Sequence, residues 1–141
     1  MAQYITHSRG ETAALGRRLA AVLENGRVVA FTGGLGAGKT AFCEGLAAGL
    51  GCTDPVSSPT FAIVNYYRGP RPLAHFDLYR IHAQSDLEAA GFYDYLDQGA
   101  VVAVEWSEHF ADLLALEQPV RVDIQRLDDT TRRITIEGAE L

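Results

Sequence analysis

A glycine-rich loop between an apolar run and a helical segment constrains the fold of this chain more than any other feature. Residues 33–40, Gly-Gly-Leu-Gly-Ala-Gly-Lys-Thr, satisfy the pattern G-x-x-x-x-G-K-[ST]. The apolar residues 28–31 before the loop are typical of a buried strand, and residues 39–50 after it place Phe42 and Leu46 at helical spacing. A strand, a glycine loop and a helix without a gap predict a phosphate-binding loop in an α/β domain.

The residue types of this loop suit a nucleotide phosphate and its metal ion. Glycines let successive backbone N–H groups turn inward as an anion site, and the N-terminus of the following helix adds partial positive charge. Lys39 can reach the β- and γ-phosphates, and the Thr40 hydroxyl can bind Mg²⁺. The predicted nucleotide-binding residues are Gly33, Gly36, Ala37, Gly38, Lys39, Thr40 and Ala41.

Two carboxylates compete for the position beside the metal. Glu105 ends the apolar run 100–104, as expected of a central parallel strand that delivers an acid to the phosphates. Asp77 follows the mixed segment 73–76 and is predicted to bind the metal or to orient the attacking water. A surface salt bridge between Asp77 and Arg80 is an equally good explanation of this aspartate.

Four further polar or aromatic positions have a structural interpretation, and one of them also has a functional one. Thr60 follows Ser-Pro in a predicted loop, where its hydroxyl could complete the metal shell as a switch threonine does, or could simply cap a turn. Trp106 is expected in the core beside Glu105. His75 and His109 belong to no metal set or nucleophilic triad, so both are expected to be structural.

The whole chain, residues 1–141, is expected to form a single domain. The predicted elements, besides those around the loop, are helix 11–24 with Ser8 or Thr12 as its cap, a hairpin of strands 61–67 and 73–78, a short helix started by a Ser85–Glu88 capping box, strand 100–104, helix 107–116, and a C-terminal hairpin of strands 120–127 and 132–136.

Composition narrows the function further. Lys39 is the only lysine among the 12 Lys and Arg residues, so the Asn-Lys-x-Asp segment usual in guanine-specific sites is absent and ATP is the expected nucleotide. The net charge of −6 argues against extensive, non-specific binding of nucleic acid. No apolar run is long enough for a membrane helix, and the N-terminus is too polar for a secretory signal, so a cytoplasmic protein with free thiols at Cys43 and Cys52 is expected.

Four segments, in this order and at these intervals, resemble the TsaE (YjeE) family. They are Gly-Ala-Gly-Lys-Thr at 36–40, Ser-Pro-Thr at 58–60, His-Phe-Asp-Leu-Tyr-Arg at 75–80 and Glu-Trp at 105–106. The resemblance spans nearly the whole chain. It implies a P-loop NTPase-like, three-layer α/β fold with a mixed, mainly parallel sheet, and a bacterial ATPase required for threonylcarbamoyl modification of adenosine beside the tRNA anticodon. The family works with TsaD and TsaB, so tRNA contact through these partners is implied.

The resemblance also implies roles by position. Lys39 contacts phosphate, Thr40 and Glu105 bind Mg²⁺, Asp77 is needed for hydrolysis, and Thr60 lies in a switch-like loop.

One position departs from the family pattern, and one segment and one arginine are candidates for binding the base. Gly34 stands where many members carry an acid, which leaves the phosphate loop intact but removes a charge from its outer face. Residues 8–12 and Arg133 are candidate contacts for the nucleotide base.

Two other functions use the same loop. A small-molecule kinase would pass the γ-phosphate to a metabolite, although 141 residues leave little chain for a substrate pocket and a basic lid. A regulatory module would bind ATP without hydrolysing it. The preferred hypothesis is an ATPase whose hydrolysis is coupled to partner binding.

Overall fold

The computed structural model describes residues 2–34, 38–56 and 63–141, and the strands in these ranges form one sheet of seven strands. Its order is β1-β7-β6-β2-β5-β4-β3. The four central strands β6, β2, β5 and β4 are parallel, and the outer pairs β6–β7, β7–β1 and β4–β3 are antiparallel. The strands are β1 (Ala2–Thr6), β2 (Val28–Thr32), β3 (Val64–Tyr67), β4 (Leu73–Asp77), β5 (Val101–Glu105), β6 (Val120–Arg126) and β7 (Arg132–Glu137).

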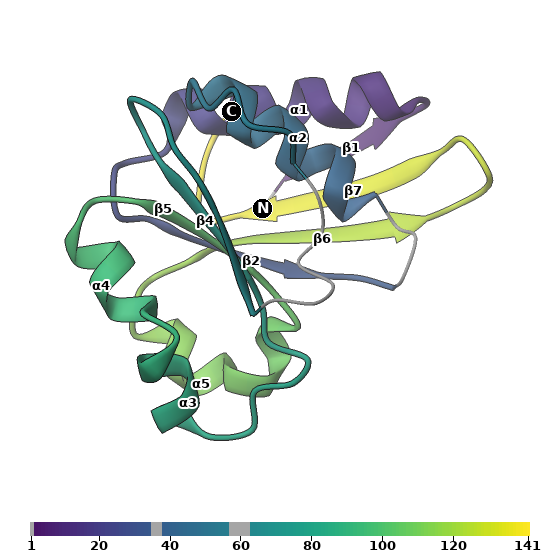
Figure 1. Cartoon of the computed structure of the whole chain (residues 1–141). Helices are drawn as coiled ribbons and strands as arrows, with labels where there is room; N and C mark the ends of the chain where they lie inside the picture. Colours follow the sequence, from purple (N-terminus) through teal and green to yellow (C-terminus); the bar gives the residue numbers. More distant parts are fainter. Residues whose placement is uncertain (1, 35–37, 57–62) are drawn as a thin grey trace.

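Helices cover both faces of this sheet, which makes three layers (Figure 1). Helices α1 (Arg9–Val22) and α2 (Lys39–Gly49) lie on one face. Helices α3 (Gln84–Ala89), α4 (Phe92–Asp97) and α5 (Ala111–Ala115) and the 3₁₀-helix η1 (Ser107–Phe110) lie on the other. The predicted α/β class, mixed sheet and C-terminal hairpin are confirmed.

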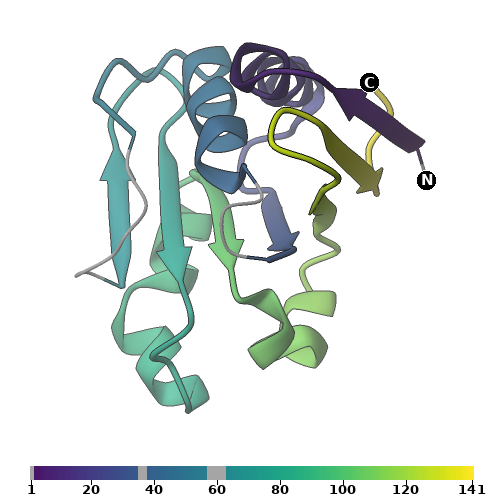
Figure 2. The same ribbon diagram turned by 90° about the vertical axis from the view of Figure 1, so that its right-hand side faces the viewer.

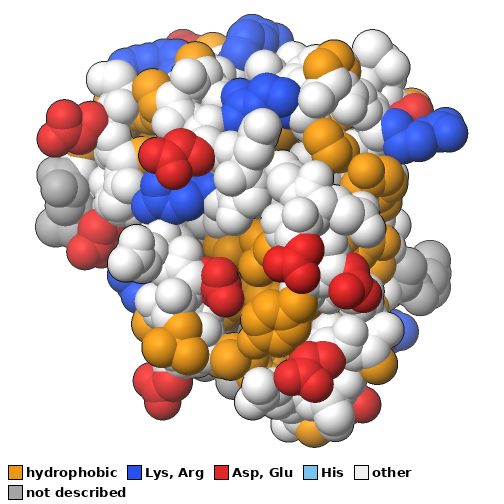
Figure 3. All heavy atoms as spheres, turned by 90° about the vertical axis from the view of Figure 1, so that its left-hand side faces the viewer, with side chains coloured by type: hydrophobic (Ala, Val, Ile, Leu, Met, Phe, Trp, Pro, Cys, Tyr) orange, Lys and Arg blue, Asp and Glu red, His pale blue; other side chains and the backbone are white. Residues whose placement is uncertain are grey.

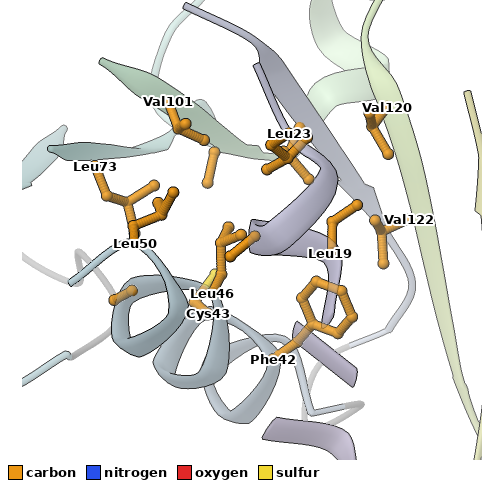
Figure 4. Packing of buried hydrophobic residues seen from close by; sticks show 14 of the residues in the cluster. Leu19, Leu23, Phe42, Cys43, Leu46, Leu50, Leu73, Val101, Val120 and Val122 are labelled. Atoms are coloured by element: carbon orange, nitrogen blue, oxygen red, sulfur yellow. The ribbon is translucent and has the colours of Figure 1, made fainter. Parts of the chain in front are cut away.

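Helices α1 and α2 pack closely against each other because small residues let their backbones approach. A Cβ atom added at Gly45 of α2 would lie 1.7 Å from the carbonyl oxygen of Ala13 in α1. The apolar faces of both helices, including Leu19, Phe42 and Leu46, are fully buried above β2 and β6 (Figure 4). This packing fixes where α2 begins relative to the ends of the strands.

The layer formed by α3, α4 and α5 has a separate apolar core. Phe76 of β4 packs edge-to-face on Phe92 of α4, with ring centroids 5.7 Å apart. Tyr66 of the edge strand β3 stacks on Tyr95 at 5.3 Å and is 41% exposed. On this side of the molecule, acidic side chains border an apolar surface patch (Figure 3).

Three local expectations were incomplete or wrong. The strand β1 was not predicted, because its five residues carry little hydrophobic signal and pair only with β7 at the sheet edge. The Ser85–Glu88 capping box is wrong, since α3 starts one residue before Ser85 and its N-cap is Ala83, which makes no side-chain cap bond. The segment 107–116 divides into η1 and α5 rather than forming one helix.

The remaining expectations hold within a residue or two where the structure describes them. Ser8 caps α1 as predicted, accepting a hydrogen bond from the Glu11 amide, and the two hairpins form. Cys43 and Cys52 are free and buried. Among the described residues, no helix has the length and hydrophobicity needed to cross a lipid bilayer.

Candidate functional site

A pocket of about 600 Å³ opens where α2 begins, at the edge where the parallel strands end. Figure 2 shows the carboxyl ends of β2, β5 and β4 on this same edge of the sheet. In open α/β sheets such edges are the usual place for ligands, and this volume suits a small molecule. The lining residues are His7, Ser8, Arg9, Thr12, Gly38, Lys39, Thr40, Ala41, Asp77, Glu105, Trp106, Asp129, Thr130 and Arg132.

Two glycines of the loop are required by the backbone around them. Gly33 has φ +125°, and a Cβ atom there would lie 2.2 Å from the carbonyl oxygen of Ile124. Gly38, the N-cap of α2, has φ +106° in the left-handed region. Because side chains rarely adopt such φ values, both positions favour glycine.

The first turn of α2 is arranged to receive an anion. Gly38 provides no side-chain cap, and the turn contains no acidic residue, so the helix N-terminus keeps its positive potential. Lys39 is 8% exposed, and its Nζ donates to the Gly33 carbonyl oxygen at 3.1 Å. The same Nζ lies 5.8 Å from the centre of the Trp106 ring. The ammonium group therefore sits beside the loop at the pocket wall.

The two predicted carboxylates meet at the ends of neighbouring strands. Asp77 of β4 and Glu105 of β5 are direct partners in the parallel register, and both line the pocket. Asp77 Oδ1 accepts a hydrogen bond from the Tyr79 amide at 3.0 Å. Both residues lie within the described part of the chain, and no salt bridge joins Asp77 to Arg80 there, so the structural alternative for this aspartate is not observed.

Glu105 is nearly buried and has a histidine neighbour. Its side chain is 10% exposed, and Oε2 lies 2.9 Å from Nε2 of His75, whose side chain is 1% exposed. His75 was expected to be structural, but the structure places it directly behind a pocket carboxylate. The sequence could not show this contact, since it joins two strands that are 30 residues apart in the chain.

Trp106 follows the end of β5 and precedes η1 in an unfavourable backbone conformation. Its φ of 58° lies in the left-handed region, which is rare for a bulky side chain. Its ring contacts Tyr79 with centroids 5.0 Å apart, and it both packs against the apolar core on this side of the sheet, as expected, and lines the pocket. Backbone strain of this kind gathers at functional sites, where the surrounding structure holds it in place.

The outer walls of the pocket come from both ends of the chain. Residues 8–12, predicted as a base-side contact, supply Ser8, Arg9 and Thr12 to one wall. Arg133, the other predicted contact, does not line this pocket, whereas the neighbouring Arg132 does, and Arg133 lies on the other face of β7. Further lining residues, which the sequence did not single out, are His7, Asp129 and Thr130.

Some predicted residues are not tested by this geometry. Gly36, Ala37 and Thr60 lie outside the described residues, as does the side chain of His109. Gly33 does not line the pocket, although its carbonyl oxygen holds Lys39.

Two residues of the pocket wall carry oxygen donors of the kind that suits a magnesium ion. Among the described residues, no group of three or more His, Cys, Asp or Glu could hold a metal ion alone. The Thr40 hydroxyl and the Glu105 carboxylate supply the hard oxygen donors that Mg²⁺ prefers beside nucleotide phosphates.

Comparison with known proteins gives the family. A family model described as threonylcarbamoyl adenosine biosynthesis protein TsaE matches residues 6–134, a range that includes the glycine loop and both carboxylates. The chain belongs to the TsaE family. This family is involved in threonylcarbamoyladenosine biosynthesis on tRNA.

Individual relatives agree with this assignment over most of their length. The chain is 36% identical over 132 residues to the tRNA threonylcarbamoyladenosine biosynthesis protein TsaE of Treponema pallidum, covering 94% of this chain and 97% of that protein. It is 40% identical to the protein of that name in Bacillus subtilis, covering 89% of this chain and 78% of the relative. The fold is similar to a crystal structure of Bacillus subtilis YdiB, with a TM-score of 0.79, 33% identity, and 99% and 86% of the two chains covered.

Proposed function

We propose that the chain binds Mg-ATP in this pocket and hydrolyses it in support of the threonylcarbamoyl modification of tRNA. The observation that carries the proposal is the convergence of Lys39, at the N-terminus of α2, with Asp77 and Glu105 on one pocket. Phosphoryl transfer needs a cationic cradle for the phosphates and an acid that holds the metal or orients water. Both kinds of group line the same pocket.

The proposed roles follow from position. The amides of the loop and Lys39 bind the β- and γ-phosphates. Thr40 and Glu105 hold Mg²⁺, which neutralises charge on the transferred group, and Asp77 orients the attacking water. Thr60, which lies outside the described residues, is proposed to complete the metal shell when the γ-phosphate is present.

The base is proposed to lie between the outer walls, against residues 8–12 on one side and Arg132 on the other. Arg132 Nη1 donates to the carbonyl oxygen of Asp128 at 2.8 Å, so its guanidinium is already oriented along this wall.

The proposed partners are TsaD and TsaB, with tRNA reached only through their assembly, in the cytoplasm. The charge distribution supports an indirect role, because residues 81–120, which include α3, α4 and α5, contain no Lys or Arg. A surface that neutralises no phosphates gains little electrostatic affinity for RNA. The acidic residues in this range are Asp86, Glu88, Asp94, Asp97, Glu105, Glu108, Asp112 and Glu117.

Coupling to the partners is proposed to act through the loops around the nucleotide. ATP and Mg²⁺ would order the segments that carry Thr60 and Asp77 and so create or remove a surface for the TsaD–TsaB assembly. Hydrolysis would then reset the assembly between turnovers.

A small-molecule kinase is the second candidate function, since it would use the same phosphate-binding loop and the same metal ion. Product analysis separates the two. Purified protein with γ-labelled ATP is expected to release inorganic phosphate, and the Lys39→Ala variant serves as the blank. Label recovered in a metabolite would support the kinase. Binding of ATP without any turnover, even with TsaD and TsaB present, would support a regulatory module instead.

A further inference from the structure

His75 is a buried polar residue to which the proposed function gives no role. It lies on β4 two residues before Asp77, so the side chains of His75 and Asp77 are on the same face of the sheet. Its Nε2 lies 2.9 Å from Glu105 Oε2, and its Nδ1 has no hydrogen-bond partner among the described residues.

Burying this imidazole would be energetically unfavourable if His75 served only to fill space in the core. A buried polar group without full hydrogen bonding loses its interactions with water and gains too little in return, a cost that an apolar side chain of similar size would avoid. The neighbouring positions Leu73, Ala74 and Phe76 are all apolar and buried. The Nε2 contact with Glu105 is therefore the feature that distinguishes His75 from the rest of its strand.

We propose that His75 is a positioning residue for Glu105. By engaging Oε2 from behind, the ring fixes the carboxylate so that its second oxygen is presented to the pocket. The inference rests on the proposed function, in which Glu105 holds Mg²⁺. Groups that orient a metal-binding carboxylate typically change metal affinity or activity about 10–100-fold when they are removed.

The contact between His75 and Glu105 is short but is not a well-aligned hydrogen bond. The atoms are within hydrogen-bonding distance, but the ring N–H does not point closely enough along the line to Oε2 to form a well-aligned bond. Hydrogen bonds in active sites are often misaligned without ligand and shorten in the reacting complex. Binding of the metal on the pocket side of Glu105 would draw the carboxylate into one orientation, which His75 then supports.

Two substitutions of matched size separate the contact from simple packing. His75→Gln retains an N–H donor near the position of Nε2, whereas His75→Met fills similar space without a donor. Binding of a fluorescent ADP analogue would be measured as a function of Mg²⁺ concentration and again with the metal chelated by EDTA. Urea unfolding of each variant shows whether the fold is intact.

For His75→Met, the Mg²⁺ concentration at half-saturation is expected to rise about 10-fold or more, while binding in EDTA stays unchanged. In turnover assays kcat is expected to fall more than KM changes. The Gln variant is expected to restore most of both quantities. If the Met and Gln variants match the wild type in Mg²⁺ dependence, His75 has no positioning role.

A double-mutant cycle with Glu105→Gln tests whether the effect passes through the carboxylate. In that background, His75→Met is expected to cause no further change in Mg²⁺ dependence. An equal loss in both backgrounds would mean a structural role and would overturn the inference. Wild-type protein whose nucleotide binding ignores Mg²⁺ would overturn the proposed function itself, together with this inference.

Discussion

Asp77 and Glu105 are paired in the parallel register of β4 and β5, and both carboxylates face the pocket where α2 begins. The pairing brings together two acids that are 28 residues apart in the chain. Their surroundings differ, since Asp77 accepts a backbone hydrogen bond from Tyr79 and Glu105 lies against His75. This difference supports separate roles for the two acids.

The role proposed for Asp77 predicts a loss of turnover without a loss of binding. Asp77→Asn keeps the acceptor for the Tyr79 amide and removes only the charge that would orient water. We expect kcat for ATP hydrolysis to fall by about 10²–10⁴-fold, with nucleotide affinity within a few-fold of wild type. Asp86→Asn on the exposed surface of α3 is the matched control and should leave both quantities unchanged. Equal activity in the two variants would remove Asp77 from the mechanism.

The pocket wall formed by β7 predicts a difference between two adjacent arginines. Arg132 lines the pocket, whereas Arg133 is exposed on the opposite face of the strand. Arg132→Ala is expected to weaken nucleotide binding by about 1 kcal/mol or more, the scale of a lost charge-assisted contact, and Arg133→Ala to have no effect. Calorimetric titration with ADP measures both. Equal affinities in the two variants would place the base elsewhere.

The contact between α1 and α2 predicts that Gly45 tolerates no side chain. Gly45→Ala would force a methyl group against the Ala13 carbonyl and is expected to lower the free energy of unfolding by about 1–3 kcal/mol, despite the better helix propensity of alanine. Gly10→Ala in the first turn of α1 meets only Ser8 Oγ at 3.8 Å and should be neutral or slightly stabilising. Urea denaturation of both variants tests the difference, and similar stabilities would contradict the close helix packing.

Burial raises the pKa of the Cys43 thiol well above its ordinary value, and the nearby Glu105 charge acts in the same direction. The folded state therefore favours the neutral thiol, while the unfolded chain ionises near a pH of about 8.5. Stability from this group is fully present below that pH and is lost as pH rises toward the folded pKa. The urea midpoint of the wild type is expected to fall more steeply at alkaline pH than that of Cys43→Ala. Parallel pH profiles would contradict a buried, neutral thiol.

The parts of the fold that could be predicted from the sequence are those determined by local patterns. The apolar strand before the glycine loop, the helix from Lys39 and the C-terminal hairpin each carry their signal within a few residues. The two carboxylates could be proposed because each follows an apolar run, and parallel strands bring such ends to one edge.

The remaining features depend on pairing across the sheet. The place of Arg132 in the pocket wall could not be predicted, because a shift of one residue in a strand changes the face of the sheet, and only the pairing of β7 with β6 sets that register. The contact of His75 with Glu105 crosses two strands, and the short edge strand β1 carries little hydrophobic signal of its own. None of these has a signature within a local window.

ATP hydrolysis in this pocket is proposed to be coupled to the TsaD–TsaB assembly. The most direct test is steady-state ATP turnover by the purified chain alone, then with TsaD, TsaB and tRNA, with Lys39→Ala as the blank in both conditions. We predict slow turnover alone, a clear rise in the assembly, and loss of both in the variant. Turnover that is the same with and without the partners would contradict the coupling.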